Sequence, residues 1–596
     1  MKKSKIYIHW PLMGQIPANL PPSTRIVRVE AGITFTILFG LIALGAGLWL
    51  VWRPFPILPL PPGTLAQHLK AWITLAAGSQ SPAADQYRAW VQSVGWVMAW
   101  GRPLAGVVAG LVGCALGAWI GFQPRAMDLH LDGAEVKGAD AKTLARLQQA
   151  LDSQDPEGRR WLPLVAGLAL PKRVAFQHFL IAGGTGAGKT TFLWPIYNSL
   201  RRRPDTRTFC YDPKGDFTKG TSRSTLLISP TDERSAIWDI AKDLNTQDRA
   251  RAFAEAVINS GKGKGDNAYF SETSIMILTG ILVALQETHG EEWGWGDLYD
   301  LAILPVGELR EVLRNAYPEA LAALPQEATG ESKQAGLNVS SFMASFQVLM
   351  PLCKAWKHPA NTAVVFSIRQ WLKADYQGKR NIVLQPCEGE RGGYYIGAML
   401  ALCARVIVNP SFTKLEGGVV FLLDELPSLG KVEALTRGGL IDKGRSVNCG
   451  MFLGFQSVNQ LRDIYGREQA EAMLSMVPNV FLGRTSGGEE AAYWVKAIGR
   501  QRVQKTTLSH NSRGTDINAA WGTEERDAIM AKDLAELGAH ETDEKPGWGV
   551  DALVQVSGQW LHMTIPGYEP RKKRRPHVAA DWTLAASERA PQERAA

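Results

Sequence analysis

Cysteine is scarce in this sequence. The 596 residues contain only Cys114, Cys210, Cys353, Cys387, Cys403 and Cys449. None of them forms a C-x-x-C pair or has a histidine at metal-ligand spacing, so the sequence indicates neither a zinc site nor a disulfide framework. Several lie in apolar runs, where a free cysteine behaves as a small hydrophobic residue. We therefore expect the bulk of the chain to occupy a reducing compartment.

Charge is also sparse. Charged residues make up 20% of the chain and hydrophobic residues 45%, which is typical of an ordinary folded protein and excludes a disordered one. The net charge of +8 and the pI near 9.0 are compatible with an anionic partner. Nucleic acid and lipid headgroups both fit that description, and the composition does not choose between them.

Long hydrophobic runs are confined to the first 125 residues. No charged residue occurs between Ala31 and Trp52, or between Arg102 and Arg125. Each run is long enough to cross a bilayer as a helix. The first is longer than the apolar region of a signal peptide and ends without a small-residue cleavage site. We expect a membrane domain over 1–125, with spans at about 31–52 and 103–122 and a short loop between them. Basic residues before the first span favour a cytoplasmic N-terminus, namely Lys2, Lys3, Lys5, Arg25 and Arg28.

Beyond about residue 125 the apolar runs shorten to strand and helix lengths. Helical patterns separate most of the strand-like runs, which predicts an α/β fold with a mostly parallel sheet. The predicted strands are Phe179–Ala182, Thr208–Tyr211, Asn381–Leu384, Val419–Leu423, Met451–Phe455 and Val480–Leu482. Residues 243–362 read as helical throughout, so we expect an all-α insertion there. From 566 to 596 the chain is polar and includes the basic run Arg571–Arg575, which predicts a flexible tail with affinity for lipid, for nucleic acid or for neither.

The strongest motif is GGTGAGKTT, which follows an apolar strand and opens an apolar helix. It matches the phosphate-binding P-loop pattern G-x-x-x-x-G-K-[ST]. The predicted nucleotide-binding residues are Gly183, Gly184, Thr185, Gly186, Ala187, Gly188, Lys189, Thr190 and Thr191. Glycines allow the loop to wrap around a phosphate, and the N–H groups of the helix N-terminus face the anion. We expect Lys189 to reach the β- and γ-phosphates of ATP and the Thr190 hydroxyl to bind Mg²⁺.

A second motif supplies the acids that such a loop needs. The segment GGVVFLLDELPSLG is a buried strand that ends in Asp424 and Glu425. We expect Asp424 to hold Mg²⁺ through water and Glu425 to act as the general base that polarises the attacking water. This tandem pair is the hydrolytic arrangement and disfavours a small-molecule kinase.

A third segment, KGRSVNCGMFLGFQSVNQL, contains Arg445 and Gln456. Gln456 ends a predicted strand and either senses the γ-phosphate or satisfies a turn. Arg445 is either an arginine finger for the ATP of a neighbouring subunit or a cation at a helix C-terminus. The spacing alone leaves both alternatives open. The triplet Arg201–Arg203, at the end of the predicted P-loop helix, is better explained by the helix dipole than by nucleic acid.

Taken together, these segments resemble the type IV secretion coupling proteins. The resemblance covers nearly the whole chain and rests on an ordered set, which is GGTGAGKTT, YDPKGDF at 211–217, RSAIWD at 234–239, LLDELPSLG and the KGRS…GFQSVNQL block. It implies a RecA-like P-loop domain in two parts, 126–242 and 363–565, around the all-α insertion. It also implies that Arg445 is the trans-acting arginine and that Gln456 contacts the γ-phosphate.

The resemblance further implies a two-pass protein of the bacterial inner membrane, with most of the chain cytoplasmic. Such a protein is a homohexamer at a type IV secretion channel, which receives relaxase-bound single-stranded DNA (the relaxosome) and moves it with ATP and Mg²⁺. Two alternatives remain: an ATP-gated receptor for protein export, and a septal-type chromosome translocase. The second usually carries more spans, a long linker and a winged-helix module, none of which is visible here. We assign no chemistry to the polar stretch 500–521.

Overall fold

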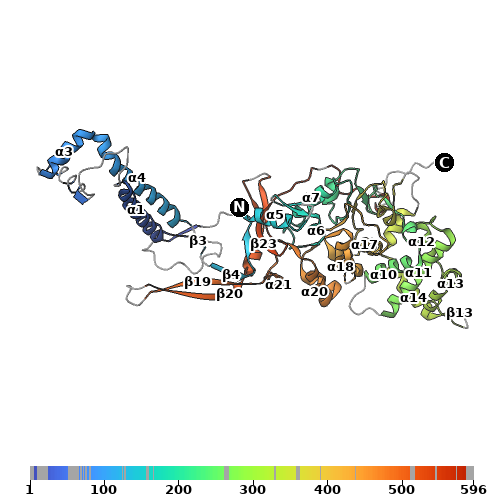
Figure 1. The fold of residues 1–596 in the computed structure, drawn as a ribbon. Helices are drawn as coiled ribbons and strands as arrows, with labels where there is room; N and C mark the ends of the chain where they lie inside the picture. The colour runs from blue at the N-terminus through green and yellow to red at the C-terminus, as the bar shows by residue number, and fades with distance from the viewer. Residues whose placement is uncertain are drawn as a thin grey trace. The chain divides into compact units, whose positions relative to one another are not determined.

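The computed structural model (Figure 1) describes two compact units. The described residues are 6–9, 25–51, 66–67, 70, 73, 77–78, 82–123, 125–126, 129–155, 160–165, 167–260, 268–327, 330–357, 363–389, 391–436, 438–510, 517–543, 546–571 and 573–584. The first unit comprises Met1–Gly133 and Gln501–Arg526, and the second comprises Ala134–Arg500 and Asp527–Ala596.

Two long apolar helices, α1 (Val29–Val51) and α4 (Trp96–Gly121), pack along each other in the first unit (Figure 1). Glycines make the close approach possible. A Cβ added at Gly117 would lie 2.3 Å from the Phe35 carbonyl oxygen, and one at Gly40 would lie 2.3 Å from Cys114 Sγ. Because the partners of α1 run in reverse order along α4, the two helices are antiparallel.

Three helices of the described residues are long and apolar enough to cross a membrane. They are α1 over Val29–Leu50, α4 over Leu104–Gly121, and α11 (Ala268–His289) in the second unit. The buried share of the apolar window is 6% in α1, 28% in α4 and 67% in α11, so α11 mostly packs inside the protein. The bent pair Lys333–Phe346 and Met350–Trp356 would make a fourth. The sequence predicted two spans, so length and composition alone leave more candidates than expected.

The described residues of the stretch 500–521 lie on two neighbouring strands. Strand β19 (Arg500–His510) lies between β20 (Ile517–Asp527) and β4 (Leu129–Gly133) in a three-stranded sheet. β19 is antiparallel to β4, and Arg502 forms an ion pair with Asp132. β19 is therefore fixed in place by its pairing with β4, although its polar residues carry no recognisable chemistry.

The second unit is built on an 11-stranded mixed sheet of order β10-β15-β9-β16-β17-β8-β18-β22-β23-β5, with β21 paired to β22. The seven strands from β10 to β18 are parallel. They are β10 (Leu226–Ile228), β15 (Asn381–Leu384), β9 (Arg207–Tyr211), β16 (Val419–Leu423), β17 (Cys449–Phe455), β8 (Phe179–Ala182) and β18 (Asn479–Leu482). Nearly every residue in them is buried, as expected for strands covered on both faces.

An antiparallel extension completes this sheet and was not predicted. It consists of β22 (Trp548–Val556), β23 (Gln559–Pro566) and β21 (Gly538–Glu541), with the short β5 (Val136–Gly138) parallel to β23 at the edge. These strands contain Trp, Gln, His and Asp among their apolar residues, so they lack the continuous apolar run that marks the central strands.

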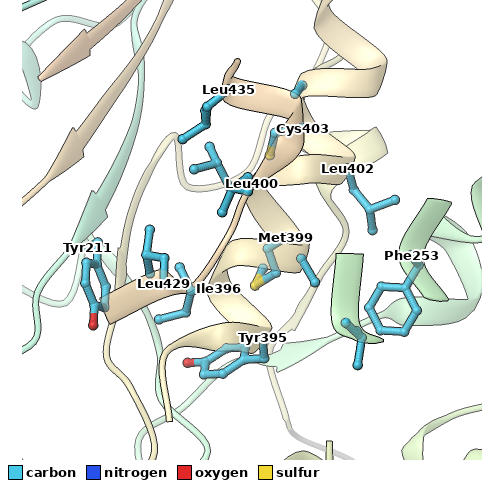
Figure 2. Close-up of a cluster of buried hydrophobic side chains, with 14 of the residues drawn as sticks. Tyr211, Phe253, Tyr395, Ile396, Met399, Leu400, Leu402, Cys403, Leu429 and Leu435 are labelled. Atoms are coloured by element: carbon cyan, nitrogen blue, oxygen red, sulfur yellow. The ribbon is translucent and has the colours of Figure 1, made fainter. Parts of the chain in front are cut away.

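Helices dominate between the two parts of the sheet, where the sequence predicted an all-α insertion. They are α10 (Gln247–Ser260), α11, α12 (Trp295–Ala302), α13 (Val306–Ala316), α14 (Lys333–Phe346) and α15 (Met350–Trp356). A two-residue hairpin, β12 (Gln326–Glu327) with β13 (Gly330–Glu331), is also present. Their core is continuous with that of the sheet through α17 (Tyr394–Ile407). Figure 2 shows Met399 and Leu402 of α17 on the side of Phe253 from α10, with Tyr211 of β9 beside Leu429.

The segment after Pro566 differs from the predicted flexible tail over its described part. Residues 573–584, which we name the C-terminal strap, lie along the sheet margin near α8 (Asp216–Gly220). Arg574 donates from Nε to the Thr218 carbonyl oxygen (3.0 Å) and from its terminal guanidinium to Thr221 Oγ1 (2.8 Å). The basic run thus adds a cation to the Thr218 carbonyl oxygen at a helix C-terminus, where Thr221 also donates, and a charge count does not reveal this contact. Residues 585–596 lie outside the described residues.

Candidate nucleotide-binding site

The P-loop connects β8 to α7 (Lys189–Leu200). Gly183, Gly186 and Gly188 all have positive φ, at 149°, 75° and 85°. A Cβ at Gly188 would lie 2.5 Å from a methyl group of Val550, so both the backbone angle and the space require glycine. The loop closes on itself and on the neighbouring strand, because Ala187 N donates to Gly184 O and Gly184 N donates to Arg484 O.

Lys189 and Thr190 begin α7 at the mouth of this loop. Lys189 Nζ donates to the Gly183 carbonyl oxygen at 2.7 Å and approaches that of Gly184 at 3.5 Å. Burial lowers the pKa of Lys189, and the charges of Glu425 and Asp424 oppose that shift. The lysine is therefore held against the loop backbone, close to the place where a phosphate would enter.

Asp424 directly follows β16 and faces the P-loop. Thr190 Oγ1 lies 3.4 Å from both carboxylate oxygens of Asp424, which is longer than a strong hydroxyl hydrogen bond. Burial raises the pKa of Asp424 to about 6, against the opposing charge of Lys189. A hydroxyl and a carboxylate at this separation are the hard oxygen ligands that Mg²⁺ prefers, and the glycine-lined loop has the backbone shape that a phosphate needs. The residues present therefore fit Mg²⁺ and a nucleotide phosphate.

Gln456 contacts Glu425 at the carboxyl ends of two neighbouring strands. Strands β16 and β17 are parallel neighbours, so the residues that follow them lie side by side at one edge. Gln456 Nε2 donates to Glu425 Oε2 at 2.9 Å. The following turn is closed by other groups, since Gln460 Oε1 accepts from the backbone N–H of Gln456 and Ser457. The Gln456 side chain therefore contacts the site and is not what closes the turn.

Arg445 lies at the opposite edge. It belongs to the short helix η4 (Gly444–Val447), which precedes β17, whereas Gln456 follows β17. A seven-residue strand separates the two, a length of roughly 23 Å at about 3.3 Å per residue. Arg445 is exposed and lines a cavity of about 930 Å³ together with Arg160, Lys172, Arg173 and Arg203. The structure thus brings Lys189, Thr190, Asp424, Glu425 and Gln456 together and leaves Arg445 away from them.

The sequence reasoning missed three residues at this edge. Asp212 and Lys214 follow β9, which pairs with β16, and Arg484 follows β18, which pairs with β8. An Arg484 guanidinium nitrogen lies 3.5 Å from the Thr185 carbonyl oxygen in the P-loop. The available signal was position, because polar residues at the carboxyl ends of parallel strands meet at one edge of a sheet.

Known proteins resemble this chain in sequence and in fold. A family model described as "Type IV secretion-system coupling protein DNA-binding domain" matches residues 163–545. A curated relative, the coupling protein TraD of Escherichia coli (strain K12), is 24% identical over 444 residues. That match covers 72% of this chain and 58% of TraD, so the chain spans less than two thirds of the relative's length.

Among solved structures, similarity is found to the bacterial conjugative coupling protein TrwB lacking 70 N-terminal residues. Its unbound form has a TM-score of 0.60 and 20% identity, with 76% of this chain and 98% of that chain covered. TrwB in complex with ADP and Mg²⁺ has a TM-score of 0.57 and 19% identity over the same shares. At this identity the likeness establishes a shared fold.

Proposed function

Because the chain belongs to the type IV secretion coupling proteins, we propose that it is an ATPase of the bacterial inner membrane that drives DNA transfer. Its substrate would be relaxase-bound single-stranded DNA, which it passes to a type IV secretion channel. The observation that carries the proposal is the contact between Gln456 and Glu425 beside the pair Thr190 and Asp424. The amide of Gln456 holds the proposed general base, Glu425, next to a metal-binding pair and a P-loop, and this arrangement suits hydrolysis.

Each residue at this edge has a proposed role. Lys189 and the loop Gly183–Thr191 would bind the phosphates of ATP, and Thr190 with Asp424 would hold Mg²⁺. Bound Mg²⁺ supplies neutralisation of the charge that develops on the phosphates. Glu425 would accept a proton from the attacking water, and Gln456 fixes one oxygen of that carboxylate so that the other is free for the water. The TrwB structure with ADP and Mg²⁺ supports nucleotide and metal binding by this fold.

The position of Arg445 supports assembly into a homohexamer. We infer that this exposed arginine, on the edge opposite Glu425, reaches the ATP of an adjacent subunit. An arginine finger in trans stabilises the charge of the transition state. The nucleotide-binding domain would consist of residues 126–242 and 363–565, with the all-α domain of 243–362 between them.

The antiparallel pair α1 and α4 would form a two-pass membrane anchor. Both helices expose large apolar side chains along their length, including Leu41, Trp49, Leu111 and Trp119. Such side chains suit lipid, with tryptophan at the interface. By contrast, two thirds of the apolar window of α11 is buried within the protein, which supports a place in the fold rather than in the bilayer.

The deciding experiment is ATP hydrolysis by the full-length protein in detergent, with and without single-stranded DNA, at low and moderate salt. We expect strong stimulation by DNA that weakens as salt rises, because counterions compete for the phosphates. The stimulated rate should be absent in Glu425→Gln. Hydrolysis that ignores DNA at both salt concentrations would refute the DNA motor and favour an ATP-gated receptor for protein export.

A further inference from the structure

Lys214 stands at the tip of a turn beside the catalytic acids. In the pairing of β9 with β16, Tyr211 is opposite Leu423. The next residues, Asp212 to Lys214, therefore leave the sheet alongside Asp424 and Glu425. Lys214 is exposed, and among the described residues it has no hydrogen-bond or ion-pair partner.

The turn that carries Lys214 is rigid. The buried Asp212 carboxylate accepts from both the backbone N–H and the hydroxyl of Thr218, each at 2.7 Å. Gly215 has φ 74°, and a Cβ there would lie 2.9 Å from Pro576 of the C-terminal strap. Asp212 is buried against Thr218 and forms no ion pair with Lys214, and these hydrogen bonds hold the backbone that carries the lysine.

The charge of Lys214 acts on the site. Burial is the main cause that raises the pKa of Asp424, and Lys189 and Lys214 both oppose it. Burial is also the main cause that lowers the pKa of Lys189, and Lys214 lowers it further. The charge of Lys214 therefore lies near enough to the site to lower the pKa of both the P-loop lysine and the metal-binding acid.

We propose that Lys214 is a second cationic contact to the terminal phosphate of bound ATP, made at the same sheet edge as the P-loop but from β9, on the other side of β16 and β17 from β8. The inference rests on the proposed ATPase function and assigns it one more catalytic residue. With Lys189 on one side and Lys214 on the other, the γ-phosphate would be held between two ammonium groups. ADP lacks that phosphate, so Lys214 would distinguish ATP from ADP.

The test compares Lys214→Ala and Lys214→Arg with Arg223→Ala in the full-length protein. Arg223→Ala removes one exposed positive charge from the turn that follows α8 and serves as the charge-matched control. Binding of ADP and of a non-hydrolysable ATP analogue is measured for each, together with kcat. For Lys214→Ala we expect unchanged ADP affinity, a loss of roughly tenfold or more in analogue affinity, and a fall in kcat of about 10- to 100-fold. Lys214→Arg should retain most of both, and Arg223→Ala should match wild type.

Equal weakening of ADP and analogue would assign Lys214 a structural role and overturn the proposal, as would unchanged binding and kcat. If the wild-type protein hydrolyses ATP normally in either case, only this inference fails. A wild-type protein that neither binds nor hydrolyses ATP would instead overturn the proposed function and this inference with it.

Discussion

At the scale of single residues, Lys189 is the side chain on which nucleotide binding depends most directly. Its ammonium is directed at the Gly183 and Gly184 carbonyl oxygens inside the P-loop. Lys189→Ala should reduce ATP turnover by at least about 100-fold, because it removes a charge-assisted contact to the transferred phosphate. The rate of phosphate release measures this. Lys142→Ala, an exposed lysine on the helix Ala141–Asp152, should leave the rate unchanged. Wild-type turnover in Lys189→Ala would contradict the P-loop assignment.

His178, which precedes β8, makes stability depend on pH. The residue is 2% exposed, and burial lowers its pKa from 6.5 to about 4. The unfolded chain therefore binds a proton at a higher pH than the folded one. The contribution to the free energy of unfolding is complete above pH 6.5 and is lost as the pH falls towards 4, by about 3 kcal/mol in total.

His178→Asn isolates this effect, because asparagine tolerates the positive φ of 64° at this position. Denaturant unfolding is compared near neutral pH and near the lower pKa. Wild type should lose more stability than the variant on acidification. An identical pH dependence in the two proteins would show that the His178 imidazole has the same pKa in the folded and unfolded states.

Much of the site was accessible from the sequence because its residues occur in contiguous motifs. Gly183–Thr191 and the pair Asp424 and Glu425 each follow a strongly apolar strand, and local pattern reveals them. The contact of Gln456 with Glu425 depends on β17 lying next to β16, which is a property of the sheet order. Lys214 and Arg484 were missed for the same reason, since no role could be assigned to Lys214 within YDPKGDF and Arg484 lies in no recognised segment.

At the scale of elements, the C-terminal strap stabilises α8 through Arg574. Arg574→Ala should lower the free energy of unfolding of this region by about 1–3 kcal/mol, because two hydrogen bonds from a partly buried guanidinium are lost. Hydrogen exchange of Asp216–Thr221 should accelerate. Arg571→Ala is the matched control in the same basic run, since Arg571 is exposed. Equal effects of the two variants would indicate a general charge effect instead of a specific clamp.

Asp243 ties together the two chain segments that flank the helical region, 237–243 and 367–369. Its buried carboxylate accepts from Trp238 Nε1, Ser367 Oγ and the backbone N–H groups of Ile368 and Arg369, at 2.7–2.9 Å. Asp243→Asn would set an amide NH₂ against these donors and should cost about 2–4 kcal/mol of stability. Thermal unfolding measures this, with the exposed Asp375→Asn as control. A variant as stable as wild type would show that the four donors do not require a carboxylate.

The elements differ in how well pattern predicts them. Six of the seven parallel strands are short apolar runs between helices, and the predicted ranges match them to within two residues, whereas the three-residue β10 was not predicted. The strands β21 to β23 escaped because they mix polar residues among their apolar ones, so they lack the continuous apolar run of the parallel strands. The strap escaped because its order comes from partners such as Thr218 and Pro230, which lie more than 350 residues earlier in the chain.

At the scale of the whole molecule, Arg445 and Glu425 should complement each other between subunits. Arg445→Ala and Glu425→Gln should each reduce ATP turnover by about 100-fold or more when every subunit carries the change. Mixed assemblies should recover part of the activity, because some interfaces pair an intact arginine with an intact glutamate. Turnover is measured against the mixing ratio. No recovery at any ratio would indicate that Arg445 is a helix-terminal cation with a structural role.

The separation of Arg445 from Glu425 by the full length of β17 has a consequence for stoichiometry. Under the role proposed for Arg445, a lone subunit carries two half-sites that cannot meet. An open row of subunits has one complete site fewer than it has members, and only ring closure makes the two numbers equal. Specific activity per subunit would therefore rise with protein concentration and reach its plateau when the ring closes, so that turnover itself reports assembly.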